Sequence, residues 1–258
     1  MADKGVQTLD RALDIIEMLS IEREGLGVTE IGSRIGLHKS TVHRLLNSLA
    51  ERGYIEKEAR YSTYKLGLKF IEISSLYLNK LELKTEALPY MRRLVEAVGQ
   101  PAHLAILDGR EAVYIEKVEA LNSIRMYSQI GRRVPVYCSA IGKVLLLGLK
   151  PKEREDVVRG LQFSKFTKKT IDSAEKLLCE IEHAGNCGWS LDDEEHEAGI
   201  RCIAAPIRDY TLKVIAAVSV SGDLKIIAPE RDSEISGLVT ETARCISRRM
   251  GYFEKVIS

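Results

Sequence analysis

The residues that follow Leu37 have the types and spacing needed to read a nucleic acid. Val42, Leu45 and Leu49 recur at helical intervals, so one face of a helix over this stretch is apolar. The opposite face carries hydrogen-bonding side chains, several of them basic. The first turns of such a helix can enter the DNA major groove and meet base edges and phosphates. This polar face consists of Lys39, Ser40, Thr41, His43, Arg44 and Asn47.

The segments before this helix are suited to position it. Ile31 and Ile35 lie one turn apart in a short amphipathic stretch that stops at Gly36, so a helix, a tight turn and a second helix are predicted. Residues 9–19 form a further helical pattern, which we expect to brace this pair. The apolar positions of that first helix are Leu9, Ala12, Leu13, Ile16 and Leu19.

The stretch after Gly53 predicts a β-hairpin. Its pattern changes to period two on both sides of a turn at residues 59–62. A hairpin directly after the second helix is the wing of a winged helix-turn-helix, and Arg60 at its tip is placed to reach a phosphate or the minor groove. With His38, which precedes the second helix, the expected DNA-binding residues are His38, Lys39, Ser40, Thr41, His43, Arg44, Asn47 and Arg60.

Charge is unevenly distributed over this region. Residues 1–33 contain three Lys or Arg and seven acidic residues, a balance of −4, whereas residues 34–66 contain seven and three, a balance of +4. Because the formal net charge of the whole chain is only +1, any nucleic-acid contact must come from such a local patch. The alternative is that these basic residues merely solvate a helical face.

A second group of reactive side chains lies within residues 192–202. A solvated acidic loop is one interpretation. A metal site of Asp192, His196 and Cys202, with Cys138 as a further donor, is another, because such ligands suit zinc, although the spacing matches no standard pattern. The same three residues could instead form a cysteine hydrolase, which requires a thiol beside the imidazole and an oxyanion hole.

A third candidate is the helix start at residues 138–143, Cys138-Ser139-Ala140-Ile141-Gly142-Lys143. A hydroxyl, small side chains and backbone amides meet there. Such a helix terminus favours the carboxylate or phosphate of a small ligand. As an isolated signal it is shared by many helices.

The elements after residue 83 predict an α+β domain with a mostly antiparallel sheet and helices on its faces. Predicted strands cover residues 102–107, 112–118, 124–128, 202–207 and 214–221, and predicted helices cover 88–98, 138–149, 173–183 and 235–250. The connecting stretch 68–83 is apolar on several faces of a helix. Such a helix must be covered, and we expect a homodimer contact there.

Composition describes an ordinary globular protein of 258 residues, with 45% hydrophobic and 29% charged residues. No secretory leader is recognisable before Val6, and no apolar run reaches the roughly 18 residues of a membrane span. The five cysteines form no CxxC pair, so reduced thiols in the cytoplasm are expected. Those outside the acidic cluster, together with the tryptophan, are predicted as core residues: Cys179, Cys187, Trp189 and Cys245.

Taken together, several separated motifs resemble the IclR family of bacterial transcriptional regulators over nearly the whole chain. The matching stretches are Leu37-His38-Lys39-Ser40-Thr41-Val42-His43-Arg44-Leu45-Leu46, residues 64–68, Cys138-Ser139-Ala140-Ile141-Gly142-Lys143, residues 188–195 and Gly199-Ile200-Arg201-Cys202-Ile203-Ala204-Ala205-Pro206.

The resemblance implies a winged helix-turn-helix domain (residues 1–66), a linker helix (67–82) and a GAF-like or profilin-like effector-binding and oligomerisation domain (83–258). It implies homodimers or dimers of dimers that bind a palindromic operator in double-stranded DNA. A small effector is implied, an organic, keto or sugar acid. By position, the residues implied to line the effector pocket are Met126, Val134, Ala140, Ile141, Asp192, Ile200, Cys202, Ser219 and Ser221.

The resulting expectation is a cytoplasmic regulator of catabolic genes, with repression favoured over activation and without catalysis, cofactor, metal or membrane attachment. Two rival functions stay open. One is an enzyme that uses Cys202, His196 and Asp192 with the first domain as a tether. The other is a winged helix that binds protein and never DNA.

Overall fold

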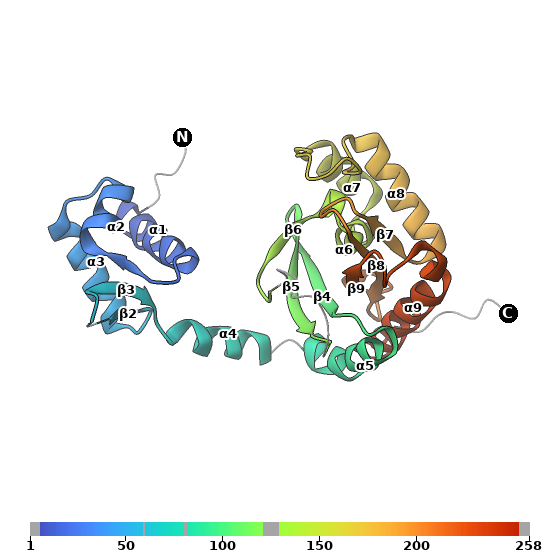
Figure 1. Ribbon diagram of the computed structural model, residues 1–258, viewed down its shortest axis with the longest axis horizontal. Coiled ribbons are helices and arrows are strands. Elements are labelled where there is room, and N and C mark those ends of the chain that lie inside the picture. The colour runs from blue at the N-terminus through green and yellow to red at the C-terminus, as the bar shows by residue number, and fades with distance from the viewer. Residues whose placement is uncertain (1–5, 59, 80–81, 121–128, 253–258) are drawn as a thin grey trace. The chain divides into compact units, whose positions relative to one another are not determined.

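The computed structural model describes residues 6–58, 60–79, 82–120 and 129–252. It divides into two compact units, Met1–Lys80 and Leu81–Ser258 (Figure 1). No helix within the described ranges combines the length and the apolar character that a bilayer crossing demands.

The N-terminal unit is a winged helix-turn-helix, as predicted. Strands β2 and β3 pair from Ile55↔Leu66 to Glu58↔Thr63 and form the wing hairpin, and the small antiparallel sheet has the order β1-β3-β2. The elements are α1 (Gln7–Ile21), β1 (Leu26–Gly27), α2 (Val28–Ile35), α3 (Lys39–Glu51), β2 (Ile55–Glu58), β3 (Thr63–Leu66) and α4 (Lys69–Asn79).

The turn between α2 and α3 depends on Gly36. Its φ of 65° lies in the left-handed region, which glycine adopts without steric cost, and its amide donates to the Gly32 carbonyl. The turn brings together an apolar core from all three helices and the sheet. Fully or nearly fully buried members are Ile15, Leu19, Leu26, Ile31, Val42, Leu46, Ile55 and Tyr64.

The first helix faces the core differently from the prediction. Leu19 is buried, but Leu9 and Leu13 are exposed and Ile15 occupies the core instead. Leu68 and Ile71 beside and within α4 are also exposed. Apolar surface therefore remains on α1 and α4 of the described chain.

The C-terminal unit has the expected α+β architecture. One antiparallel sheet has the order β6-β5-β4-β9-β8-β7, and helices cover both of its faces (Figure 1). Its elements are α5 (Glu82–Val98), β4 (Ala102–Asp108), β5 (Glu111–Val118), β6 (Arg133–Pro135), the 3-10 turn Val136–Cys138, α6 (Ala140–Leu145), the 3-10 turn Leu146–Gly148, α7 (Pro151–Arg159), α8 (Ala174–Cys187), β7 (Ser190–Asp193), β8 (Ile200–Arg208), β9 (Val214–Asp223), the 3-10 turn Pro229–Arg231 and α9 (Asp232–Arg249).

Alternation along β8 and β9 builds a separate apolar layer on each face of the sheet. Ile203 and Val218 pack with α5 and α9 in one layer. Ala204 and Ala217 pack with α6 and α8 in the other. The two layers arise because neighbouring strand residues point to opposite faces of the sheet. The small alanine side chains of the second layer leave room for α6 to lie close to the sheet.

Some predicted elements differ from the structure. Residues 138–149 form two 3-10 turns around α6 instead of one helix, because Ser139 is extended (φ −133°, ψ 136°) and caps α6. The short strands β6 and β7 were not predicted. The predicted strand at residues 124–128 lies outside the described residues.

Candidate functional site

Helix α3 separates its apolar and polar faces as the sequence predicts. Val42, Leu45 and Leu49 face the core. His38, Lys39, Ser40, His43, Arg44 and Asn47 are exposed, and Thr41 is half-buried. None of the seven is used by the apolar core.

The cations on this face are not neutralised by the chain itself. Arg34 on α2 pairs with Glu22 and Glu30, each at 2.7 Å. By contrast, Lys39 and Arg44 make no ion pair or side-chain hydrogen bond with any described residue. Because α3 contains no acid before its last residue, Glu51, its first turns present positive charge to solvent.

The wing adds a further exposed cation. The Arg60 guanidinium lies 5.3 Å from the ring centre of Tyr61, at the end of the β2–β3 hairpin. Lys65 is tied to Glu58 at 3.1 Å across the hairpin. Arg60, like Lys57 of β2, is thus a wing cation without an acidic partner among the described residues and is available to a phosphate.

A cavity in the C-terminal unit gathers the second set of predicted residues. Eight of the nine line it, whereas Met126 lies outside the described residues. The eight are Val134 from β6, Ala140 and Ile141 from α6, Asp192 from β7, Ile200 and Cys202 from β8, and Ser219 and Ser221 from β9.

The cavity has further polar walls beyond the nine predicted lining residues. They are His103, Tyr114, Arg132, Ser139, His196 and Glu197. Of these, Ser139 belongs to the predicted helix-start site, and His196 to the metal-binding and hydrolase alternatives. His103 pairs with Ser219 across β4 and β9, and its ring lies 5.0 Å from that of Tyr114. Because side chains alternate along a strand, the sequence places His103 on the face of β4 opposite to Leu104. Only the pairing of the strands shows that this face lines a cavity.

The floor of the cavity is fixed by a close approach of α6. The Ser139 Oγ accepts from the Gly142 amide at 3.3 Å and donates to the Pro135 carbonyl at 2.7 Å. A Cβ at Gly142 would lie 2.4 Å from the Val136 Cα, so only glycine fits at this position. Ala140 and Ile141 are thereby held against the cavity.

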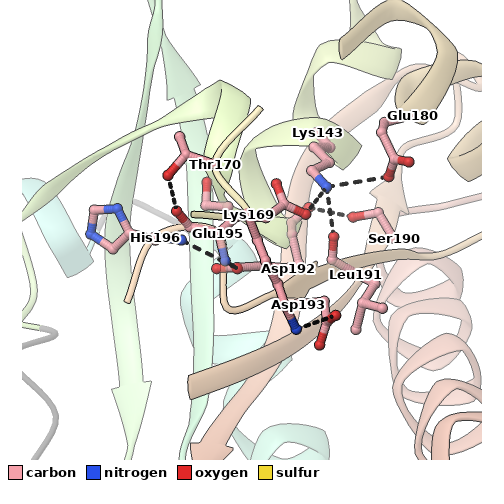
Figure 2. A network of polar contacts seen from close by, with 12 residues as sticks. Lys143, Lys169, Thr170, Glu180, Ser190, Leu191, Asp192, Asp193, Glu195 and His196 are labelled. Carbon is pink, nitrogen blue, oxygen red and sulfur yellow. Dashed lines mark hydrogen bonds and ion pairs between the residues drawn. The ribbon is translucent and has the colours of Figure 1, made fainter. Parts of the chain in front are cut away.

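Asp192 is the buried acid of the cavity. Its Oδ1 accepts from the Glu195 amide at 2.7 Å and from the His196 amide at 3.4 Å (Figure 2). Burial, together with the neighbouring Glu195 carboxylate, raises the pKa of Asp192 to about 7. Since Asp192 and Glu195 are 3% and 8% exposed, the interpretation of this stretch as a solvated acidic loop is wrong for both.

The thiols beside Asp192 are not activated. The Cys138 Sγ lies 3.5 Å from the His196 Nδ1. Burial raises the pKa of the Cys138 and Cys202 thiols and lowers the pKa of His196, so the neutral forms of all three are favoured. A cysteine nucleophile requires the opposite shift of the thiol pKa.

Other features of the cysteines also bear on the alternatives. Within the described residues, no group of three or more His, Cys, Asp or Glu side chains is arranged to hold a metal ion. Cys179 and Cys187 are exposed on α8, so their prediction as core residues is wrong. Trp189 packs, partly buried, against the core layer of α5 and α9.

Two family models match the chain. The IclR helix-turn-helix domain matches residues 8–59, and the bacterial transcriptional regulator IclR C-terminal domain matches residues 75–248. The HTH-type transcriptional regulators XynR and KdgR of Escherichia coli (strain K12) are each 36% identical to the chain. The alignments cover 96% of this chain and 98% and 94% of those proteins.

Solved structures agree with these matches. The IclR of Thermotoga maritima is 31% identical with a TM-score of 0.82, over 95% of this chain and 99% of that one. An IclR homologue from Microbacterium hydrocarbonoxydans, in complex with 4-hydroxybenzoate, is 25% identical with a TM-score of 0.83, again over 95% and 99%.

Proposed function

The chain belongs to the IclR family of bacterial transcriptional regulators, and from that premise we propose which of its surfaces binds DNA and which cavity binds the effector. It is a DNA-binding regulator with a helix-turn-helix. Relatives of similar length include the HTH-type transcriptional repressor AllR of Klebsiella pneumoniae, 34% identical over 97% of this chain. Repression of catabolic genes in the cytoplasm is the proposed role.

The DNA-binding surface comprises the exposed face of α3, with Lys39 and Arg44, and Arg60 of the wing. The observation that carries this assignment is that the described chain leaves Lys39 and Arg44 without an acidic partner while it pairs Arg34 twice. Unpaired cations at the start of an exposed helix favour phosphate contacts, and the neighbouring Ser40, His43 and Asn47 can read base edges.

The effector is a small hydroxylated carboxylic acid. Arg132 supplies positive charge for a carboxylate, while Ser219 and Ser221 supply hydroxyl groups. Asp192 can accept from a ligand hydroxyl when ionised and donate when protonated, since its pKa is about 7. The relative that binds 4-hydroxybenzoate holds a compound with the same two functional groups.

Operator binding requires a homodimer, alone or within a dimer of dimers. Leu9 and Leu13 of α1 are 57% and 46% exposed, and Ile71 of α4 is 64% exposed. A second copy that covers these apolar faces would bring together two α3 helices, which could then read half-sites about one helical turn apart.

No catalytic step is assigned to the cavity, because burial raises the pKa of its thiols and a cysteine nucleophile requires a thiolate. A cavity that offers hydrogen-bonding groups without an activated thiol suits reversible binding. The protein-binding alternative for the winged helix is tested with random-sequence duplex at low salt, where a DNA-binding surface retains non-specific affinity and a protein-binding surface has none.

A thermal-shift experiment on the full-length protein tests the effector assignment. D-Gluconate, lactate and 4-hydroxybenzoate, which each carry a carboxylate and a hydroxyl group, serve as probes. A ligand at 100 times its Kd stabilises the fold by about 2.7 kcal/mol, which is a rise in Tm of several degrees. A rise with at least one probe, lost in Ser219→Ala/Ser221→Ala, supports the cavity. An unchanged Tm with all three argues against this ligand class.

A further inference from the structure

Lys143 of α6 is a completely buried lysine, with 0% of its side chain exposed. Its Nζ donates to the Glu195 carboxylate at 2.6 Å, to the Leu191 carbonyl at 2.7 Å and to the Glu180 carboxylate at 3.3 Å (Figure 2). Burial of an ammonium group is costly unless it is paired and hydrogen-bonded. Such a group therefore has a strong preference for this one arrangement of its partners.

Two of these partners lie on either side of Asp192. Leu191 directly precedes it and Glu195 follows it by three residues, so Lys143 holds both ends of one turn. A further bond links the same two segments in the opposite direction: the Ser190 Oγ donates to the Ala140 carbonyl of α6 at 2.6 Å. Helix α6 is thus attached to the segment 190–195 through Lys143 (Figure 2) and through the bond from Ser190.

The outer side of the turn is held by a second set of bonds. The Thr170 Oγ1 donates to the Glu195 carbonyl at 2.7 Å, and the Thr167 Oγ1 donates to the Glu194 carbonyl at 2.6 Å. Glu194 itself has a φ of 61°, in the left-handed region that residues other than glycine rarely adopt. The turn is therefore kept in this conformation by its surroundings.

The conformation matters because it aims two amides at Asp192. Those of Glu195 and His196 both point to the Asp192 Oδ1, and Asp192 lines the cavity. Lys143 itself does not line the cavity. The Glu195 Oε2 has no hydrogen-bond partner among the described residues, and the Oε1 of the same carboxylate accepts from the Lys143 Nζ at 2.6 Å.

We propose that Lys143 is a positioning residue for the effector cavity: through Leu191 and Glu195 it holds the turn whose amides orient the Asp192 carboxylate toward the ligand. The proposal rests on the proposed function of the cavity, but the structural link from Lys143 to Asp192 is independent of which ligand binds. The effector never touches Lys143.

Several groups determine the pKa of Asp192, and Lys143 is one of those that lower it. The amides of its own turn favour the ionised form, whereas burial and the Glu195 carboxylate disfavour it. Without Lys143 the turn can move, and the amides of Glu195 and His196 then no longer donate to the Asp192 carboxylate. Loss of these hydrogen bonds raises the pKa of Asp192 further. The titratable and charged groups that face Asp192 are Glu195 and His196 on its turn, Lys143 on α6, Cys202 on β8, Tyr114 on β5 and Cys138 before α6.

The direct test measures the pKa of Asp192 in the full-length protein without ligand. Protein labelled with [4-13C]aspartate is titrated by NMR, and Asp192→Asn assigns the resonance. We expect Lys143→Met to raise the pKa of Asp192 by about one pH unit, as loss of hydrogen bonds to a carboxylate does. Lys169→Met is the matched control, because Lys169 bonds to Asp193 and Glu194 of the same turn but is 49% exposed.

A second variant separates positioning from simple stability. In Lys143→Met/Glu195→Met an apolar pair replaces the buried ion pair, which restores much of the stability lost in the single variant. Because loss of the Glu195 carboxylate by itself lowers the pKa of Asp192, the double variant is compared with the single variant Glu195→Met. We expect the Tm of the double variant to recover while its Asp192 pKa stays above that of Glu195→Met. A recovered Tm with the same Asp192 pKa as Glu195→Met would show that Lys143 only stabilises the fold and would overturn the proposal.

The ligand arm uses D-gluconate. Both variants should bind it about tenfold more weakly than wild type, the effect of losing one hydrogen bond to a charged group. If wild type does not bind D-gluconate, a probe that does raise its Tm takes the place of D-gluconate. If no probe binds, the proposed ligand class fails, and the Asp192 titration alone decides the role of Lys143.

Discussion

Asp192 on β7 lies directly opposite Cys202 on β8, and Cys202 lies opposite Ser221 on β9. Strand pairing thus places an acid, a thiol and a hydroxyl in one row along the cavity. Because burial raises the pKa of both Asp192 and Cys202, this row offers mostly neutral hydrogen-bonding groups near neutral pH. The row suits a ligand whose polar groups lie along one edge and form hydrogen bonds with these three side chains.

The buried acid predicts a specific dependence of stability on pH. The pKa of Asp192 is about 7 in the folded protein and 3.8 as the reference value of an aspartate. Between these values the folded state binds more protons than the unfolded state, so the contribution of Asp192 to stability is complete below pH 4 and is lost as pH rises through 7. From pH 5 to 8 the loss is about 3 kcal/mol.

Urea unfolding of wild type and Asp192→Asn at pH 5 and pH 8 measures this contribution. The variant should lack the part of the pH dependence that comes from Asp192. Titration of His103, whose pKa burial lowers to about 3, acts in the opposite direction and cancels in the comparison because both proteins contain it. Parallel pH profiles for the two proteins would mean that Asp192 is ionised throughout.

The DNA assignment predicts different effects for two arginines. Arg44→Ala should weaken binding to duplex DNA and reduce the slope of log K against log salt by about 1, because one phosphate contact is lost. Arg34→Ala should have a much smaller effect, since Glu22 and Glu30 already neutralise that guanidinium. Fluorescence anisotropy with a labelled duplex at several salt concentrations gives both quantities. Equal effects of the two substitutions would contradict the assignment of α3.

The helix-turn-helix could be predicted from the sequence because its signals are local. Ile31, Gly36 and Val42 lie within a dozen residues of one another, and their spacing alone specifies two helices and a turn. The side of α1 that meets the core was harder to predict. Leu9 and Leu13 follow helical spacing but remain exposed, since periodicity identifies an apolar face and cannot show what covers it.

The cavity could be predicted from sequence only in part. Resemblance to the family supplied eight residues that the structure places around it, but His103 and Tyr114 have the appearance of ordinary strand residues. Their position follows from the pairing of β4 with β5 and with β9. Strands β4 and β9 are more than a hundred residues apart along the chain. The burial of Lys143 likewise depends on contacts with Leu191 and Glu195, which lie about fifty residues further along the chain. Local sequence patterns cannot predict such contacts.

The exposed apolar face of α4 predicts a change of assembly on substitution. Ile71→Glu should shift the protein from dimer toward monomer, because a charge cannot be buried in an apolar contact between copies without a large penalty. Sedimentation velocity at micromolar concentration measures the shift. Leu212→Glu, at a position 52% exposed in the turn between β8 and β9, is the control for a general effect of removing surface leucine or isoleucine. A wild-type protein that is strictly monomeric would refute this contact.

Coupling between the cavity and α3 gives the last prediction. If a probe that raises Tm weakens binding to a selected operator duplex by some factor, saturation with that duplex must weaken probe binding by the same factor, because linkage is reciprocal. Isothermal titration with and without duplex measures one side, and anisotropy with and without probe measures the other. Asp192→Ala should reduce probe affinity and leave the affinity for duplex in the absence of probe unchanged, since Asp192 lines only the cavity. A probe that binds equally well with and without duplex has no differential affinity for the two states, and so cannot be the effector that controls DNA binding.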